Sequence, residues 1–152
     1  MSVAKLVSGC KERVFVTVEL YQMADLVAAD LNGFSDPYCD VWVGKQRWKS
    51  VVKKKTLNPV WDCRDERPPS AVFTSPGGSQ LKVEITVMDH DRIGKHDFLG
   101  DLVIDLSQWE INTSKYQWWP LEHTSSGEIC LRVTVETEAF VRQSIIKALP
   151  KK

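Results

Sequence analysis

The sequence lacks an excess of either charge, since 20 Lys and Arg balance 20 Asp and Glu among 152 residues. A chain with no net charge has no global field that attracts nucleic acid or a membrane, so any electrostatic function depends on local clusters. No apolar run approaches the roughly 18 residues of a transmembrane helix. The start, MSVAKLVSGCKERV, is too short and too polar for a secretory signal, and Ser2 stands where myristoylation needs glycine. These absences predict a cytoplasmic protein that does not bind nucleic acid.

Patterns typical of enzymes and of zinc sites are also missing. The four cysteines are spread singly, without a CxxC pair, which indicates reduced thiols and no zinc site. Cys39 or Cys63 with a histidine could in principle form a nucleophilic pair. However, no histidine accompanies either cysteine in a recognisable motif, and there is neither a glycine loop for phosphate nor an elbow around a serine. The sequence therefore predicts that the chain is not an enzyme.

Alternation of apolar and polar residues runs along nearly the whole chain. Val14, Val16, Val18 and Leu20 alternate with polar or aromatic residues, and seven further segments, with Gly, Pro, Asn and Asp between them, are read as strands. The eight expected strands cover residues 14–20, 38–44, 46–52, 60–67, 81–88, 98–106, 116–122 and 128–136. Residues 68–80, PPSAVFTSPGGSQ, are expected to form a loop from their composition. This pattern predicts an all-β, antiparallel sandwich.

The last residues follow a different period. Val141, Ile145 and Leu149 fall four apart, with Phe140 and Ile146 beside them, as in a short amphipathic helix. Such a helix either docks on the sandwich, remains a linker, or contacts a membrane or a protein partner. We therefore expect one domain over residues 1–136, with its core at about 13–136, followed by a tail over 137–152.

Aspartates are concentrated in two segments between expected strands. Residues 87–98, VMDHDRIGKHDF, carry Asp89, Asp91 and Asp97, and residues 29–38, ADLNGFSDPY, carry Asp30 and Asp36. Closely spaced carboxylates repel one another unless a cation lies between them. Calcium takes six to eight oxygen ligands at about 2.3–2.6 Å, and magnesium takes fewer from protein in a stricter octahedron. The aspartates therefore predict a calcium site, and the alternative is that they are solvated turn formers.

The spacing of these aspartates excludes an EF-hand. Counted from Asp89, the fifth position is Ile93 and the twelfth is Gly100, where an EF-hand loop needs an oxygen ligand and a glutamate.

Several motifs in order resemble the C2 domain of protein kinase C and synaptotagmin. They are DLNGFSDPY (30–38), TLNPVW (56–61), the VMDHD segment and HDFLG (96–100), within a resemblance that covers about residues 13–136. The resemblance implies an eight-stranded Greek-key sandwich. It also implies two or three calcium ions, held by the aspartates at 30, 36, 89, 91 and 97 with help from the backbone carbonyls of Ala29 and His90.

The order of the segments favours the type II circular permutation of this family. The chain opens with the strand that leads into the first acidic segment, and it closes with an extra strand, GEICLRVTVE. One segment departs from the family pattern: WDCRDER (61–67) has Asp65 and Arg67 where aromatic residues are usual. Either this strand is shorter here, or its core contact comes from Val72 and Phe73.

Apolar residues at expected loop tips suggest contact with a membrane. Leu31 and Phe34 flank Asn32-Gly33, and Ile93 lies at the tip of the later acidic segment. Burying each such side chain in lipid is worth roughly 1.5–3 kcal/mol. The alternative for Leu31 and Phe34 is local packing under the loop. The resemblance to protein kinase C implies that Asn32 and Arg92 contact phosphatidylserine.

A basic segment, KQRWKSVVKKK (45–55), places Arg47 and Lys49 on one face of a strand. A lysine-rich face at this strand binds phosphoinositide headgroups in some C2 domains, and the alternative is protection of an edge strand against aggregation. The resulting hypothesis is calcium-dependent binding of anionic phospholipid membranes by a monomeric, peripheral module that leaves the cytoplasm when calcium rises. The alternative is a calcium-regulated protein-interaction module that uses the C-terminal tail and binds no lipid.

Overall fold

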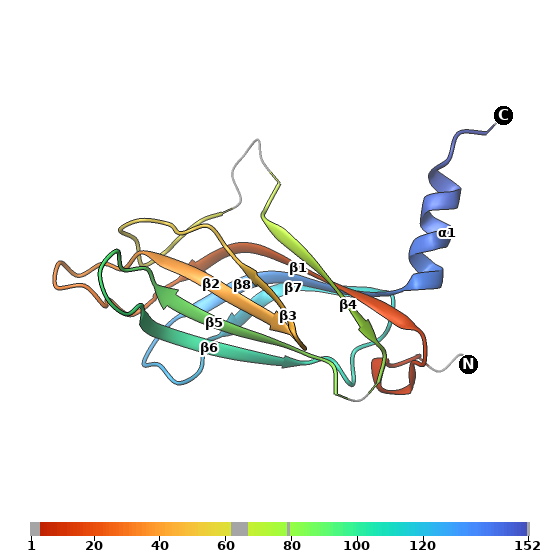
Figure 1. Ribbon diagram of the computed structural model, residues 1–152, viewed down its shortest axis with the longest axis horizontal. Coiled ribbons are helices and arrows are strands. Elements are labelled where there is room, and N and C mark those ends of the chain that lie inside the picture. Colours follow the sequence, from red (N-terminus) through yellow and green to blue (C-terminus); the bar gives the residue numbers. More distant parts are fainter. Residues whose placement is uncertain (1–3, 62–66, 79, 152) are drawn as a thin grey trace.

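Two four-stranded antiparallel sheets pack face to face in the computed structural model, which describes residues 4–61, 67–78 and 80–151 (Figure 1). One sheet has the order β4-β1-β8-β7 and the other β3-β2-β5-β6. The strands are β1 (Arg13–Ala24), β2 (Pro37–Val43), β3 (Gln46–Lys49), β4 (Ser70–Pro76), β5 (Lys82–Asp89), β6 (Asp97–Asp105), β7 (Thr113–Pro120) and β8 (Glu128–Thr137). The predicted all-β sandwich is confirmed.

The connection order agrees with the expected type II permutation. The first strand, β1, lies between β4 and the last strand, β8, and leads directly into the first acidic segment. Residues 4–12 contain no strand; they form one 3-10 turn, η1 (Val7–Gly9), and an isolated bridge from Leu6 to Glu110. The chain therefore opens and closes as the motif order predicts.

Period-two alternation places the apolar side chains between the sheets. Val14, Val16, Val18 and Leu20 of β1 are fully buried, and they meet Val41 and Ile85 of the opposite sheet in one core cluster. Burial of apolar surface is the main favourable term in folding. Between these positions, Phe15, Thr17 and Glu19 face outward and are partly exposed.

One strand was predicted in the wrong place. Residues 68–80 were expected to be a loop, but Ser70–Pro76 form β4, which pairs with β1. Phe73 is buried and fills the core, as one of the two alternatives anticipated, whereas Val72 is 62% exposed. The predicted strand at 60–67 lies largely on residues 62–66, outside the described residues, and Val60 forms only an isolated bridge with Gln22. Because β4 is an edge strand, it tolerates the prolines and serines that suggested a loop.

The predicted C-terminal helix is present and extends away from the sandwich. Helix α1 (Glu138–Ala148) begins after Thr137, whose Oγ1 accepts a 3.2 Å hydrogen bond from the backbone N–H of Phe140. No residue of α1 is buried, so the docked alternative is wrong (Figure 1). Among the described residues, no helix has the length and apolar content needed to cross a membrane.

Candidate metal centre

The two acidic segments lie at the same end of the sandwich (Figure 1). We call residues 25–36, between β1 and β2, the first acidic loop, and residues 90–96, between β5 and β6, the second acidic loop. Strand pairing brings them together, because Pro37 at the start of β2 lies opposite Asp89 at the end of β5. His90 continues this contact, since its backbone N–H donates a 2.8 Å hydrogen bond to the carbonyl oxygen of Asp36.

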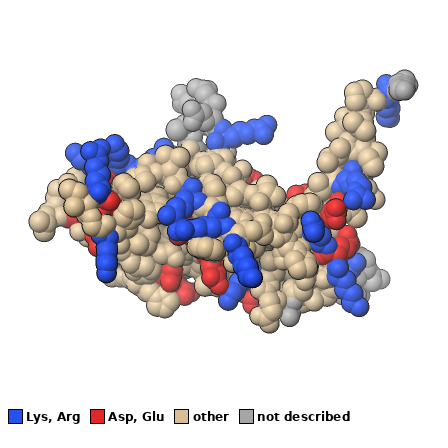
Figure 2. Space-filling model, viewed as in Figure 1, with Lys and Arg blue, Asp and Glu red and all other residues tan. Residues whose placement is uncertain are grey.

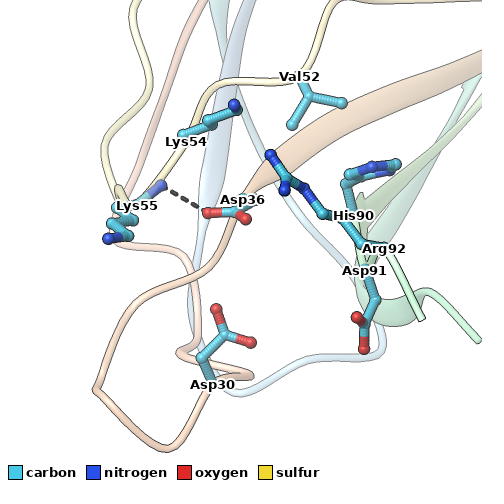
Figure 3. A pocket seen from close by; sticks show the side chains of 8 residues that line it. All are labelled: Asp30, Asp36, Val52, Lys54, Lys55, His90, Asp91 and Arg92. Atoms are coloured by element: carbon cyan, nitrogen blue, oxygen red, sulfur yellow. Dashed lines mark hydrogen bonds between the residues drawn. The ribbon is translucent and has the colours of Figure 1, made fainter. Parts of the chain in front are cut away.

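Carboxylates from both loops converge on one opening. Asp30, Asp36 and Asp89 each offer a carboxylate oxygen, and these atoms all lie within 4.8 Å of one another. Asp30 and Asp36 also line a pocket of about 630 Å³ at this end of the sandwich, and Asp91 of the second acidic loop lines it with them (Figure 3). We call it the acidic pocket. Such a set of hard oxygen donors suits a divalent cation such as calcium.

Asp97, the fifth predicted ligand, lies beside this group rather than within it. It pairs across the sheet with Asp89, at the point where β5 ends and β6 begins.

Asp91 makes a hydrogen bond within its own loop, because its Oδ1 accepts from the backbone N–H of Ile93 at 3.1 Å. This bond shapes the tip of the second acidic loop and orients the Asp91 side chain.

Asp89 carries an electrostatic cost. It is only 1% exposed, and its Oδ1 accepts a 2.6 Å hydrogen bond from the backbone N–H of Asp36. Burial is the main cause that raises the pKa of Asp89, and the charge of Asp30 raises it further, while the hydrogen bond opposes the shift. A cation in the pocket relieves both unfavourable effects, because it attracts the charged form that burial and like charges disfavour.

Ser35 holds the first acidic loop in shape, a role that sequence analysis did not assign. It is fully buried; its Oγ donates to the carbonyl of Val27 and accepts from the backbone N–H of Ala29, both at 3.0 Å. Asp30 is fixed by a 3.0 Å hydrogen bond from its N–H to the carbonyl of Phe34. Ser35 lies inside the quoted DLNGFSDPY motif, so its sequence position was visible but its hydrogen bonds were not.

Basic residues form part of the rim of the same pocket. Lys54, Lys55 and Arg92 line it beside the carboxylates, and the backbone N–H of Lys55 donates a 2.6 Å hydrogen bond to Oδ1 of Asp36 (Figure 3). The sequence analysis selected only Arg47 and Lys49 from the basic segment at 45–55 and did not predict that Lys54 and Lys55 line this pocket. A pocket with acidic walls and a basic rim can hold a cation and an anionic ligand together.

The loop tips present apolar side chains to solvent. Leu31 is fully exposed, Ile93 is 87% exposed and Phe34 is 45% exposed. Local packing is therefore wrong for Leu31, while Phe34 is half covered. The side chain of Asn32 is engaged within its turn, since its Oδ1 accepts a 3.1 Å hydrogen bond from the N–H of Phe34.

The basic strand β3 is paired with a strand that carries an anionic residue, Asp40 of β2. Arg47 of β3 forms two 2.7 Å hydrogen bonds to the carboxylate of Asp40 on β2, and its guanidinium lies 5.1 Å from the Trp42 ring centroid. The ammonium of Lys49 lies 6.0 Å from the Tyr38 ring centroid. Basic side chains gather over β2 and β3 on the visible face (Figure 2). Asp40 offsets the charge of Arg47, which the sequence analysis did not anticipate.

Cys39 is unsuited to nucleophilic chemistry. It is fully buried on β2, and burial raises the pKa of its thiol to about 12. A thiol with this pKa stays protonated near neutral pH and is a poor nucleophile. Cys63, the other cysteine considered above, lies outside the described residues.

The fold and the acidic pocket together place this chain among the antiparallel β-sandwich modules that carry a candidate cation site at one end. The family model of the C2 domain matches residues 15–121. The chain is 34% identical to Tricalbin-3 of Saccharomyces cerevisiae over 125 residues, which are 82% of this chain and 8% of that protein. It is 33% identical to Synaptotagmin-B of Diplobatis ommata over 128 residues, 76% of this chain and 27% of that protein. The chain belongs to the C2 domain family.

The solved structures agree with this assignment. A calcium-bound structure of two C2 domains of Extended-Synaptotagmin 2 superposes with a TM-score of 0.70 at 26% identity, and the match covers 91% of this chain and 53% of that one. The chain spans only 8% to 27% of the two curated relatives named above.

Proposed function

We propose that this C2 domain binds anionic phospholipid membranes when calcium fills the acidic pocket. The proposed ligands are the carboxylates of Asp30, Asp36, Asp89, Asp91 and Asp97 with the backbone carbonyls of Ala29 and His90, which together hold two or three ions. In a cell, the domain would act as a monomer that moves from the cytoplasm to a membrane surface on a rise in calcium. Catalysis is no part of the proposal.

One observation carries the proposal: the convergence of the Asp30, Asp36 and Asp89 carboxylates, within 4.8 Å of one another, at the end where Leu31 and Ile93 are exposed. Uncompensated carboxylates repel an anionic bilayer, and bound calcium removes this repulsion and can accept a lipid oxygen as a further ligand. The apolar tips can then enter the lipid.

The proposed lipid contacts are of two kinds. Leu31, Phe34 and Ile93 insert into the bilayer, and full burial of each contributes roughly 1.5–3 kcal/mol. Asn32 and Arg92 contact the phosphatidylserine headgroup. The position of Arg92 in the lining of the same pocket as Asp30, Asp36 and Asp91 supports this role (Figure 3).

Phosphoinositide binding by Arg47 and Lys49 is a further part of the proposal. The gathering of basic side chains over β2 and β3 supports it (Figure 2). The Arg47–Asp40 pair reduces the charge available to a headgroup, so we expect this contribution to be smaller than that of the acidic pocket.

Sedimentation with liposomes tests the proposal. The full chain is mixed with phosphatidylserine vesicles or with phosphatidylcholine vesicles, in calcium or in chelator. We expect binding only to the anionic vesicles and only in calcium, and its loss in the double variant Asp89→Asn/Asp91→Asn. Binding in chelator that equals binding in calcium would contradict the proposal.

A charge-matched control separates the loss of the proposed calcium ligands from the loss of two negative charges. Glu110→Gln/Glu138→Gln also removes two carboxylates, both exposed and away from the acidic loops. We expect this control to bind like the wild type.

A second variant, Leu31→Ala/Ile93→Ala, is expected to keep calcium binding but to lose at least about tenfold in vesicle affinity, since each side chain contributes roughly 1.5 kcal/mol or more. Val72→Ala, at an exposed residue of β4, is its control.

Helix α1 favours a second candidate function, a calcium-regulated interaction with a protein partner. Phe140, Ile145, Ile146 and Leu149 are between 40% and 60% exposed, and α1 buries no residue. We propose residues 1–136 as the domain and 137–152 as a tail, of which the domain does not need residues 138–152 for folding, since Thr137 completes β8. Removal of residues 138–152 is expected to leave vesicle binding unchanged. If vesicle binding is absent in millimolar calcium, the protein-partner function replaces the lipid function.

A further inference from the structure

A second group of metal-ligating side chains lies where β6 meets the connection between β7 and β8. Asp101 of β6 and Glu122 and His123, which follow β7, each offer one ligand atom, and these atoms all lie within 4.8 Å of one another. None of these residues belongs to the acidic pocket between the loops. The group differs chemically from that pocket, because it combines two carboxylates with an imidazole.

The backbone holds the three side chains together. Asp101 and Glu122 form an isolated antiparallel bridge in which each N–H donates to the other's carbonyl, at 3.1 Å and 2.7 Å. Side chains opposite each other in such a pair lie on the same face. His123 has a left-handed backbone with φ of 58°, and its Nδ1 lies 2.6 Å from Oδ1 of Asp101. Backbone pairing therefore brings the two carboxylates and the adjacent imidazole together.

The bridge places two like charges opposite each other, which is unfavourable unless a positive group offsets them. The imidazole of His123 lies against this pair, with its Nδ1 2.6 Å from Oδ1 of Asp101. A metal cation can contact the imidazole and both carboxylates at once, because neutral imidazole and carboxylate oxygen are both ligands of zinc.

We propose that Asp101, Glu122 and His123 form a site for a borderline-soft divalent transition metal ion, with Zn²⁺ as the representative ion. Three protein ligands leave the remaining position to solvent, as in open zinc sites. The imidazole makes the set selective against calcium, which prefers oxygen ligands only. The exposed side chains of His123 and Asp101, 72% and 33% accessible, allow the ion to enter.

The site spans the two sheets. Asp101 belongs to the sheet β3-β2-β5-β6, whereas residues 121–127 connect β7 and β8 of the other sheet. This connection also packs near the start of the first acidic loop, because a Cβ built on Gly127 would lie 3.3 Å from Leu26. A bound ion would brace this connection against β6.

Zinc titration tests the site on the full chain. Calcium is kept in excess so that the acidic pocket is occupied, and Zn²⁺ binding is followed by calorimetry and by the imidazole resonances of the three histidines. We expect one Zn²⁺ to bind with a selective shift of the His123 resonances. His123→Gln and Glu122→Gln are each expected to weaken binding at least about tenfold, since even outer partners of a metal contribute that much. Glu110→Gln, the same change at an exposed residue outside the group, is expected to have no effect.

A second measurement guards against unfolded variants. Zinc is expected to raise the melting temperature of the wild type, because an ion that binds only the folded state stabilises it, and to have no such effect on His123→Gln. Zinc binding that is unchanged in His123→Gln, or that shifts only His90 and His96, would overturn the inference. Neither result bears on calcium-dependent vesicle binding, which is measured without zinc.

Discussion

The backbone N–H of Asp36 donates a 2.6 Å hydrogen bond to Oδ1 of Asp89, and this bond joins the first acidic loop to the end of β5. The two carboxylates are therefore held close even though 53 positions separate the residues in the sequence. The cost of holding them appears in the raised pKa of Asp89, for which burial is the main cause. Bringing the carboxylates together in this way therefore disfavours the charged form of Asp89.

Removing the Asp89 charge is expected to separate calcium binding from stability. In Asp89→Asn, Oδ1 still accepts the Asp36 hydrogen bond while the buried charge is gone. In chelator, the melting temperature should equal or exceed that of the wild type, because a raised pKa means that the fold disfavours the charged form. In calcium, the increase in melting temperature that we expect for the wild type should be lost. Thermal unfolding in both buffers measures this.

Asp105→Asn is the matched control. A hydrogen bond from the backbone N–H of Ser107 lowers the pKa of Asp105, so the fold favours its charged form. The same substitution there should lower the melting temperature slightly and leave its response to calcium intact. Equal behaviour of the two variants would contradict the role assigned to Asp89.

Calcium affinity should decrease on acidification earlier than for ordinary aspartates. Protons compete with calcium for Asp89, whose pKa is raised, so protonation begins at a higher pH than for an unperturbed carboxyl. In chelator, acidification instead favours the folded state. The stabilisation from protonated Asp89 is fully present below the ordinary aspartate pKa and is lost as the pH rises through the raised pKa of the folded state. Calcium calorimetry over a pH series measures the first effect. A flat affinity down to the ordinary aspartate range would contradict it.

Loss of the Ser35 hydroxyl should weaken both the fold and the calcium site. Ser35→Ala leaves the carbonyl of Val27 and the N–H of Ala29 without their partner, at a cost of roughly 1–3 kcal/mol for a buried unsatisfied group. Calcium affinity should decrease because the first acidic loop is less ordered. Ser144→Ala on α1, where the serine is exposed and bonds only to the carbonyl of Phe140, should change neither quantity. Urea unfolding and calcium calorimetry provide the two readouts.

Asp40→Asn should increase binding to phosphoinositide vesicles in chelator. The substitution removes the negative charge that offsets Arg47 and one of the two oxygens that accept from it, and one additional basic charge near an anionic surface is worth about 1 kcal/mol, or about fivefold. Glu138→Gln releases Arg142 on α1 and changes the net charge equally, so it controls for non-specific attraction. If both variants gain equally, β2 and β3 have no specific role.

Phe73→Ala should destabilise the protein by about 3–5 kcal/mol, because it removes a large buried side chain from the core. Val72→Ala, at the next and exposed residue of β4, should stay within about 0.5 kcal/mol of the wild type. Denaturant unfolding of the pair therefore tests whether β4 is an integral strand. Similar small effects at both positions would indicate that the segment behaves as a loop.

The sandwich and the acidic loops could be predicted because short-range patterns encode them. Alternation is regular over residues 14–20 of β1 and 131–137 of β8, and the aspartates stand beside Gly and Asn, which end strands. β4 was missed because an edge strand needs only one buried face, and Phe73 alone carried that signal among Pro, Ser and Gly. Composition indicated a loop where pairing with β1 determines a strand.

Features that depend on contacts distant in the sequence could not be predicted. The Asp40–Arg47 pair requires the register of β2 against β3, and the Asp101, Glu122 and His123 group requires a bridge between two sheets. The position of α1 was also open, because apolar residues spaced four apart fit a docked and an undocked helix equally. Only the packing, or its absence, decides between them.

Helix α1 leaves the sandwich at the end remote from the acidic loops (Figure 1). A fluorescent reporter, or a tag for immobilising the protein on a sensor chip, can therefore be attached beyond α1 without shielding the loops. A domain anchored in this way would present its acidic end to vesicles in the flowing sample.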